Sequence, residues 1–221
     1  MKLLFSALTK YLTGLLLVGA LLFLPAGTLG YMNGWLFIGL LFVPMLLLGV
    51  VLFVKSPELL RKRLDAKEKE TTQKGVVALS ALLFLAGFIV AGLDFRFGWT
   101  DVPLWCVVAA SAVLLVSYAL YAEVMRENAY LSRTIEVQEG QKVVDTGLYG
   151  IVRHPMYAVT VWLFLSIPVV LGSWWALVCF LPYVAVIAVR IVNEEKVLEA
   201  GLEGYSDYKK RVKHRIIPFI W

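Results

Sequence analysis

The sequence predicts an all-α, polytopic membrane protein with about six transmembrane helical segments. Three observations support this fold class. Of the 221 residues, 60% are apolar and 17% are charged, whereas soluble domains average about 45–50% apolar and about 25% charged. The apolar residues gather in stretches that approach the roughly 20 residues a helix needs to cross a bilayer core of about 30 Å. The basic residues also fall almost entirely on one side of the predicted membrane.

Four apolar stretches in the first half of the chain have the length of a membrane span. They cover residues 3–24, 35–54, 76–93 and 102–122. Because they contain almost no ionisable groups, residues 1–123 are predicted to form a membrane scaffold. A second interpretation of the first stretch is a signal peptide, since Lys2 and Lys10 accompany an apolar run that ends near Pro25. The span is favoured, because the next segment needs a neighbour of opposite direction.

Two shorter apolar stretches, residues 157–171 and 174–189, flank Gly172 and Ser173. This dipeptide is typical of a tight turn and predicts a helical hairpin whose halves span the membrane fully or nearly so. Trp174 and Trp175 beside the turn indicate interfacial anchors, with a contact surface as the alternative. With a cytoplasmic loop before it and a C-terminal helix after it, the hairpin forms a predicted catalytic region over residues 124–221.

Charge asymmetry predicts the orientation. If all six segments cross, the outer loops (residues 25–34, 94–101 and 172–173) hold one of the 21 Lys and Arg residues, namely Arg96. The positive-inside rule then places both termini in the cytoplasm. The net charge of +5 follows from cytoplasmic loops beside anionic lipid and requires no nucleic-acid partner. The oligomeric state does not follow from the sequence.

The loops on the basic side contain two features. Residues 55–75 hold a predicted short helix that starts at Pro57, with leucines on one face and bases opposite, as in helices that lie at a membrane interface. A gate or lipid contact is one interpretation, and a solvated basic loop that sets topology is the favoured one. Residues 133–144 show β-branched alternation and predict an extended or looped cytoplasmic segment.

Cys106 and Cys179 lie within apolar stretches, where free thiols are favoured over a disulfide. With two histidines in the chain, no metal site is predicted.

The run from Gly147 to Tyr157 carries the first cluster of polar groups. His154 precedes Pro155 and is predicted to be the N-cap of a helix that begins there. The free amides of its first turn, together with Arg153 and His154, suit a carboxylate or phosphate. The alternative is that both side chains extend to lipid headgroups.

A second cluster, Arg190, Glu194 and Glu195, lies where the last apolar stretch ends. An arginine and a glutamate four residues apart often form only a modest helix brace. Charged groups at a membrane edge nevertheless need partners. A ligand that carries both a cation and an anion would satisfy both clusters at once.

These motifs resemble the isoprenylcysteine carboxyl methyltransferase family of integral-membrane methyltransferases, which is related to the phospholipid N-methyltransferases. The resemblance rests on residues 147–149, the Arg-His-Pro-Met-Tyr run at 153–157, Arg190 with Glu194 and Glu195, and the tail at 204–212. It covers the chain from about residue 134 to the C-terminus, and the first half matches only as apolar spans. The chain has no Rossmann-type Gly-x-Gly-x-x-Gly loop, so a soluble-type methyltransferase domain is not supported.

The resemblance implies S-adenosylmethionine as the cofactor. It further implies that Arg190 and Glu194 are catalytic, that Arg190 lies on the acceptor side, and that the acceptor is a lipophilic or small carboxylate, thiol or amine entering laterally between helices. The implied cofactor-binding residues are Gln141, Lys142, Val143, Val144, Tyr149, His154, Pro155, Met156, Tyr157, Glu194 and Glu195.

Two other functions fit parts of the sequence. Membrane sterol reductases that use NADPH share the Arg-His-Pro-x-Tyr element, but the predicted spans are too few for them and the paired glutamates favour a methyltransferase. A non-enzymatic transport or structural membrane protein is the third possibility. The predicted spans lack ionisable residues near the midplane, which argues against ion or proton coupling.

Overall fold

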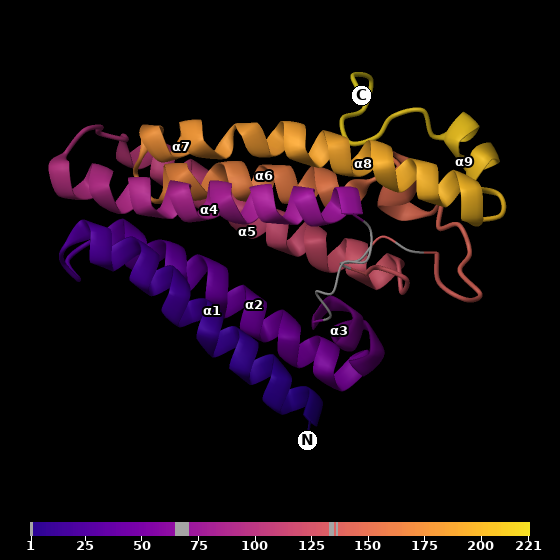
Figure 1. Cartoon of the computed structure of the whole chain (residues 1–221), viewed down its shortest axis with the longest axis horizontal. Helices are drawn as coiled ribbons and strands as arrows, with labels where there is room; N and C mark the ends of the chain where they lie inside the picture. Colours follow the sequence, from indigo (N-terminus) through magenta and orange to yellow (C-terminus); the bar gives the residue numbers. More distant parts are fainter. Residues whose placement is uncertain (1, 65–70, 133–134, 136) are drawn as a thin grey trace.

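The computed structural model describes residues 2–64, 71–132, 135 and 137–221, and these residues form helices and loops with no strand (Figure 1). The all-helical prediction is confirmed. Parts of the predicted loops 55–75 and 133–144, and the start of the family resemblance at residue 134, lie outside the described residues. The helices are α1 Lys2–Ala26, α2 Met32–Lys55, α3 Pro57–Leu64, α4 Thr71–Phe97, α5 Leu104–Glu127, the 3₁₀ helix η1 Gly147–Gly150, α6 Pro155–Val170, α7 Trp174–Phe180, α8 Pro182–Gly201 and α9 Tyr205–Arg211.

Within the described residues, five helical segments are long and apolar enough to cross a membrane: α1, α2, most of α4, α5, and α7 with α8 as one segment, Trp174–Gly201. Five such segments indicate an integral membrane protein. Helix α6 has 16 residues, which corresponds to about 24 Å at 1.5 Å per residue. That length falls short of a hydrocarbon core of about 30 Å, so the predicted count of about six transmembrane segments is not confirmed.

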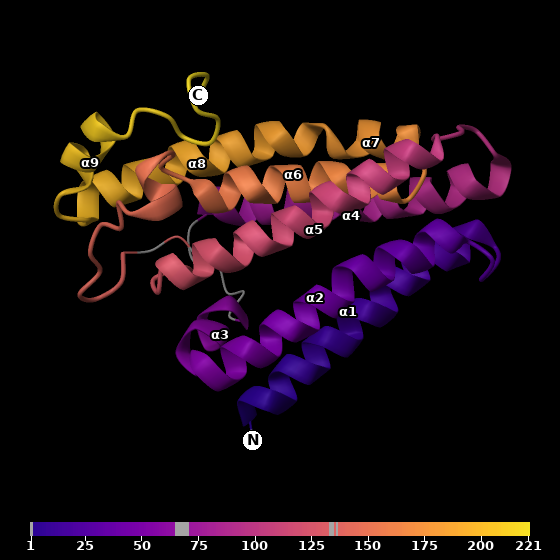
Figure 2. The same cartoon turned by 180° about the vertical axis from the view of Figure 1, so that it is seen from behind.

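The long helices run back and forth between two ends of the molecule (Figures 1 and 2). The connections α1–α2, α4–α5 and α6–α7 lie at one end, and α3 and α9 lie at the other. Helices α1 and α2 form a pair that meets the remaining helices near the first end and diverges from them towards α3. The N-terminus of α6 and the C-terminal half of α8 thus share the end that carries α3.

Aromatic packing fixes α6, α7 and α8 against α4. The Phe84 ring meets the rings of Phe164 and Phe180 edge-on, with centroid distances of 4.6 and 5.0 Å. Gly87 lies directly under Phe180, because an added Cβ would be 2.2 Å from a ring carbon. Edge-to-face pairs of this kind stabilise a core by about 0.5–1.5 kcal/mol each beyond their area burial. Tyr183 at the start of α8 also packs against Phe84, with a centroid distance of 5.6 Å.

A buried carboxylate joins the connections at the end remote from α3. Asp94 is 1% exposed and accepts hydrogen bonds from the Thr100 amide (2.8 Å) and the Thr100 hydroxyl (2.6 Å). It also accepts one from the Ser173 hydroxyl, whose oxygen in turn accepts the Ala176 amide at the start of α7 (3.0 Å). A buried carboxylate needs hydrogen-bond donors of this kind. The hydrogen bonds to Asp94 connect α4, the loop before α5 and the α6–α7 turn.

Cys106 and Cys179 are free thiols, as expected from their apolar surroundings. Helix α3 starts at Pro57, as predicted, and buries Leu59 and Leu60.

Candidate functional site

The first site element, η1, is anchored on the end of α5. Gly147 has a φ of +50°, and an added Cβ would lie 1.5 Å from a carboxylate oxygen of Glu127, so the position requires glycine. The Leu148 amide donates to Glu127 Oε2 at 3.1 Å. This anchor positions Tyr149, whose hydroxyl oxygen accepts a hydrogen bond from Asn128 Nδ2 at 3.0 Å.

The second element is the start of α6. His154 is the N-cap and Pro155 occupies the first helical position, as predicted. The amides of Tyr157 and Ala158 both donate to the His154 carbonyl oxygen at 3.1 Å. The Ala158 bond is the ordinary first i→i−4 bond of the helix. The sequence had suggested free first-turn amides, and for Tyr157 that expectation is wrong, because its amide also donates to the N-cap carbonyl.

A buried carboxylate, Glu195, links the start of α6 to the C-terminal tail. Its Oε1 accepts from Arg153 Nε at 2.8 Å and lies 3.3 Å from His154 Nε2. Its Oε2 accepts from Arg215 Nε at 3.0 Å. The backbone amides of Arg153 and His154 donate to carbonyl oxygens of the tail at 2.9 and 2.8 Å. We call Arg153, His154, Glu195 and Arg215 the Glu195 cluster. Its two guanidinium groups and one carboxylate carry a net charge of +1.

Tyr157 connects α6 to α8. Its hydroxyl donates to Glu194 Oε2 at 2.5 Å and accepts from Arg190 Nε at 2.8 Å. Arg190 and Glu194 are four residues apart on α8, and the tyrosine from α6 lies between them. The two polar clusters that the sequence suggested as opposite walls of one site therefore face each other.

These elements enclose a pocket. Its remaining side is a segment between α5 and η1, which we call the wall segment (residues 128–132, 135 and 137–144). The predicted site residues that line the pocket are Gln141, Lys142, Val143, Val144, Tyr149, His154, Met156, Tyr157, Arg190 and Glu194. Pro155 and Glu195 do not line it. Glu195 is 3% exposed and bonded within its cluster, so its carboxylate positions Arg153 and His154.

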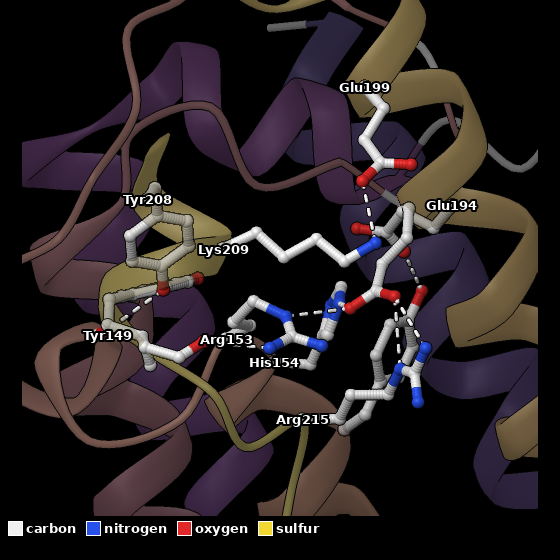
Figure 3. Close-up of polar contacts among 11 residues, drawn as sticks. Tyr149, Arg153, His154, Glu194, Glu199, Tyr208, Lys209 and Arg215 are labelled. Atoms are coloured by element: carbon white, nitrogen blue, oxygen red, sulfur yellow. Dashed lines mark hydrogen bonds and ion pairs between the residues drawn. The ribbon is translucent and has the colours of Figure 1, made fainter. Parts of the chain in front are cut away.

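The pocket has further lining residues. Arg153, which the sequence suggested as a donor to an anion, contributes to its surface, and so do Tyr130, Tyr205 and Tyr208, for which no site role was predicted. The Tyr208 hydroxyl donates to the Tyr149 carbonyl oxygen at 2.7 Å (Figure 3), and burial raises the pKa of Tyr208. The tail motif at 204–212 could have indicated Tyr205 and Tyr208 from the sequence. Their position in the pocket wall, however, depends on how α9 packs against η1.

The Tyr205 hydroxyl is a buried polar group without a partner. Tyr205 is 4% exposed, and among the described residues its hydroxyl has no hydrogen-bond partner. Burial also raises its pKa, so the group stays protonated. A buried hydroxyl without a hydrogen bond lowers the stability of the fold by about 1–3 kcal/mol. Its presence in a pocket wall points to a ligand that supplies the missing hydrogen bond.

The size of the pocket limits what enters it. The space open to the centre of a water molecule is about 100 Å³, and the whole empty space including the open mouth is about 830 Å³. Ligand sites commonly measure about 300–1,000 Å³. A molecule of cofactor size therefore fits when part of it lies in the open mouth of the pocket.

Residues 105–203 match the family model of the phospholipid methyltransferases. This range contains α6, α7, α8 and nearly all of α5, together with every lining residue of the pocket except Tyr205 and Tyr208. The match confirms the resemblance to integral-membrane methyltransferases that the motifs predicted. No curated protein matches the chain. The helices and the family match together support a membrane methyltransferase.

Proposed function

We propose that the chain is an integral-membrane methyltransferase similar to the isoprenylcysteine carboxyl methyltransferases. It uses S-adenosylmethionine and acts on a lipophilic or small acceptor, which is a carboxylate, a thiol or an amine. The observation that carries this proposal is the charge pattern of one pocket. The Glu195 cluster supplies excess positive charge on one side, the Glu194 carboxylate lies on another, and five tyrosines line the space between them: Tyr130, Tyr149, Tyr157, Tyr205 and Tyr208.

This donor set fits S-adenosylmethionine. Arg153 and His154 suit its carboxylate, and Glu194 suits its ammonium or ribose hydroxyls. Tyrosine rings attract a sulfonium cation through their faces and stack on adenine. The Tyr205 hydroxyl, which is buried without a partner among the described residues, gains one from any polar group of the ligand. When bound, the cofactor supplies a methyl group already activated by positively charged sulfur.

The residues on the other side of the pocket suit an acceptor. Arg190 orients an acceptor carboxylate or holds a thiolate, and such nucleophiles need alignment more than proton transfer. An amine acceptor must lose a proton, and Glu194 is the base placed to take it. The buried tyrosines exclude water from the reacting groups.

The proposed setting is the cytoplasmic edge of a bilayer, with both termini on that side and the acceptor entering laterally between helices. Helix α3 and α9 share the end of the molecule that carries the pocket (Figures 1 and 2). The lipid bilayer and the acceptor are the proposed partners, and nucleic acid is not.

Calorimetry on the purified protein in lipid nanodiscs tests the cofactor. We expect the wild type to bind S-adenosylmethionine, and Glu194→Gln and Tyr205→Phe to bind it roughly tenfold more weakly, because each loses a hydrogen bond from a desolvated site. Glu199→Gln is the matched control, since Glu199 pairs with Lys209 outside the pocket. No binding by the wild type, or a preference for NADPH, would contradict the proposal. Membranes incubated with radiolabelled methyl donor then identify the acceptor by the labelled product.

A further inference from the structure

The last turn of α3 brings two basic side chains to the outside of the pocket wall. We propose that Arg63 is a positioning residue for the methyl-donor pocket, through which α3 holds the wall segment and Met156 in their binding positions. This inference rests on the proposed function, because it assigns a role within the same site. It also changes the interpretation of the basic loop at 55–75. From the sequence, the favoured role of that loop was to set the orientation of the protein in the membrane.

Arg63 contacts three elements around the pocket. Its Nη1 donates to the Ser132 carbonyl oxygen at 3.3 Å and lies 3.7 Å from the Met156 sulfur. Both of these residues line the pocket. Its Nη2 bonds to the hydroxyl of Tyr121 on α5, and its guanidinium lies 5.4 Å from the centre of that ring. One guanidinium thus joins α5, the wall segment and the start of α6.

Lys62 holds the wall segment at a second point. Its Nζ donates to Gln138 Oε1 at 2.6 Å and lies 5.9 Å from the centre of the Tyr130 ring. The Gln138 amide group donates in turn to the Tyr130 carbonyl oxygen at 2.5 Å. The Gln138 backbone amide donates to the side chain of the lining residue Gln141 at 2.9 Å. The wall segment is therefore tied internally and to α3.

Helix α3 is itself fixed to the first helix pair. Leu59 and Leu60 are buried, and Leu60 and Leu64 line an apolar cavity shared with α1 and α2. Lys10 of α1 bonds to the Leu64 carbonyl oxygen, at the C-terminal end of α3. A base in that position satisfies one of the open carbonyl groups of a helix end. The support for the wall segment is therefore anchored in the membrane scaffold.

The neighbouring base Arg61 shows that charge alone does not explain these contacts. Its side chain is 69% exposed and pairs only loosely with Glu58 at 3.6 Å, as expected for a surface charge. Arg63 and Lys62 are half-buried on the same short helix. Because the wall segment supplies nine of the lining residues of the pocket, a side chain that fixes this segment in place sets the affinity for the donor.

Three variants in nanodiscs test the inference: Arg63→Met, Arg63→Lys and the control Arg61→Met. We expect Arg63→Met to weaken S-adenosylmethionine binding at least about tenfold, as for lost hydrogen bonds to a charged group. Arg63→Lys should restore part of the affinity, and Arg61→Met should stay within about twofold of the wild type. The donor KM should rise more than kcat falls, and hydrogen exchange in residues 128–144 should accelerate in Arg63→Met alone.

The outcomes separate the two proposals. If the wild type does not bind S-adenosylmethionine, the proposed function fails. If the wild type binds it and Arg63→Met binds equally well with unchanged hydrogen exchange, the role of Arg63 fails and the function stands. If Arg63→Met does not fold, Arg63→Lys and Lys62→Met provide the same comparison. We expect each of them to bind S-adenosylmethionine more weakly than the wild type, and unchanged binding would contradict the inference.

Discussion

Tyr157 is the residue that makes one site out of two helices. Its hydroxyl accepts from Arg190 and donates to Glu194, so it holds both side chains that we propose to act on acceptor and donor. The sequence placed Tyr157 in the site through its position in the first polar cluster and through a family resemblance. The contact itself joins residues 37 positions apart, which no local pattern encodes.

We expect Tyr157→Phe to lower methyl transfer by about tenfold, because both charged side chains lose a hydrogen bond in a buried site. The measurement is kcat/KM with radiolabelled donor. Tyr11→Phe is the control: it also removes a tyrosine hydroxyl that donates a hydrogen bond, here to the Phe42 carbonyl oxygen, but on α1 and outside the pocket. Equal rates for Tyr157→Phe and the control would remove Tyr157 from the mechanism.

At the scale of elements, the short helix α9 closes the pocket through Tyr208. The side chain is buried, and its hydroxyl donates to the carbonyl oxygen of Tyr149 in η1. Burial raises the pKa of Tyr208 above its ordinary value, which is about 10. A group whose folded-state pKa is raised stabilises the fold fully below its unfolded pKa, and that stabilisation is lost as the pH rises above it.

Thermal stability should therefore fall as the pH rises above about 10. Tyr208→Phe should lower the free energy of unfolding by about 0.5–1.5 kcal/mol at neutral pH, the usual net contribution of one hydrogen bond. It should also flatten the alkaline decline, because the variant has no proton to lose at this position. Unfolding curves of both proteins between pH 7 and 11 provide the measurement. A decline of the same steepness in the variant would show that other groups cause it.

At the scale of the whole molecule, the two ends of the helix array have different roles. The end with α3 and α9 carries the pocket, and the opposite end is tied by Asp94. Three donors converge on this carboxylate from Thr100 and Ser173. Removing it leaves buried donors unsatisfied, which costs more than the hydrogen bonds alone.

We expect Asp94→Ala to destabilise the protein by about 2–4 kcal/mol, seen as a lower midpoint of thermal unfolding. At temperatures where the variant is folded, its affinity for S-adenosylmethionine should equal that of the wild type. Asp101→Ala serves as the control, because Asp101 is an exposed carboxylate in the same connection. A loss of donor affinity without loss of stability would assign Asp94 to the site instead of the fold.

The sequence by itself determined the helices and the chemical groups of the site. Apolar stretches of near-membrane length predict α1, α2, α4 and α5, because bilayer thickness and backbone hydrogen bonding leave few alternatives. His154 before Pro155 predicts the start of α6, because proline favours the first helical turn. These are local constraints, and a single segment satisfies each of them.

Only the tertiary structure decided which of these groups meet. Glu194 and Glu195 are adjacent in sequence, yet successive side chains on a helix point about 100° apart. One consequently faces the pocket, and the other is buried against Arg153 and Arg215. Arg63 reaches Met156 across 93 positions. Such contacts depend on how α3, α6 and α8 pack, because partners far apart in the sequence are brought together by packing and not by local propensity.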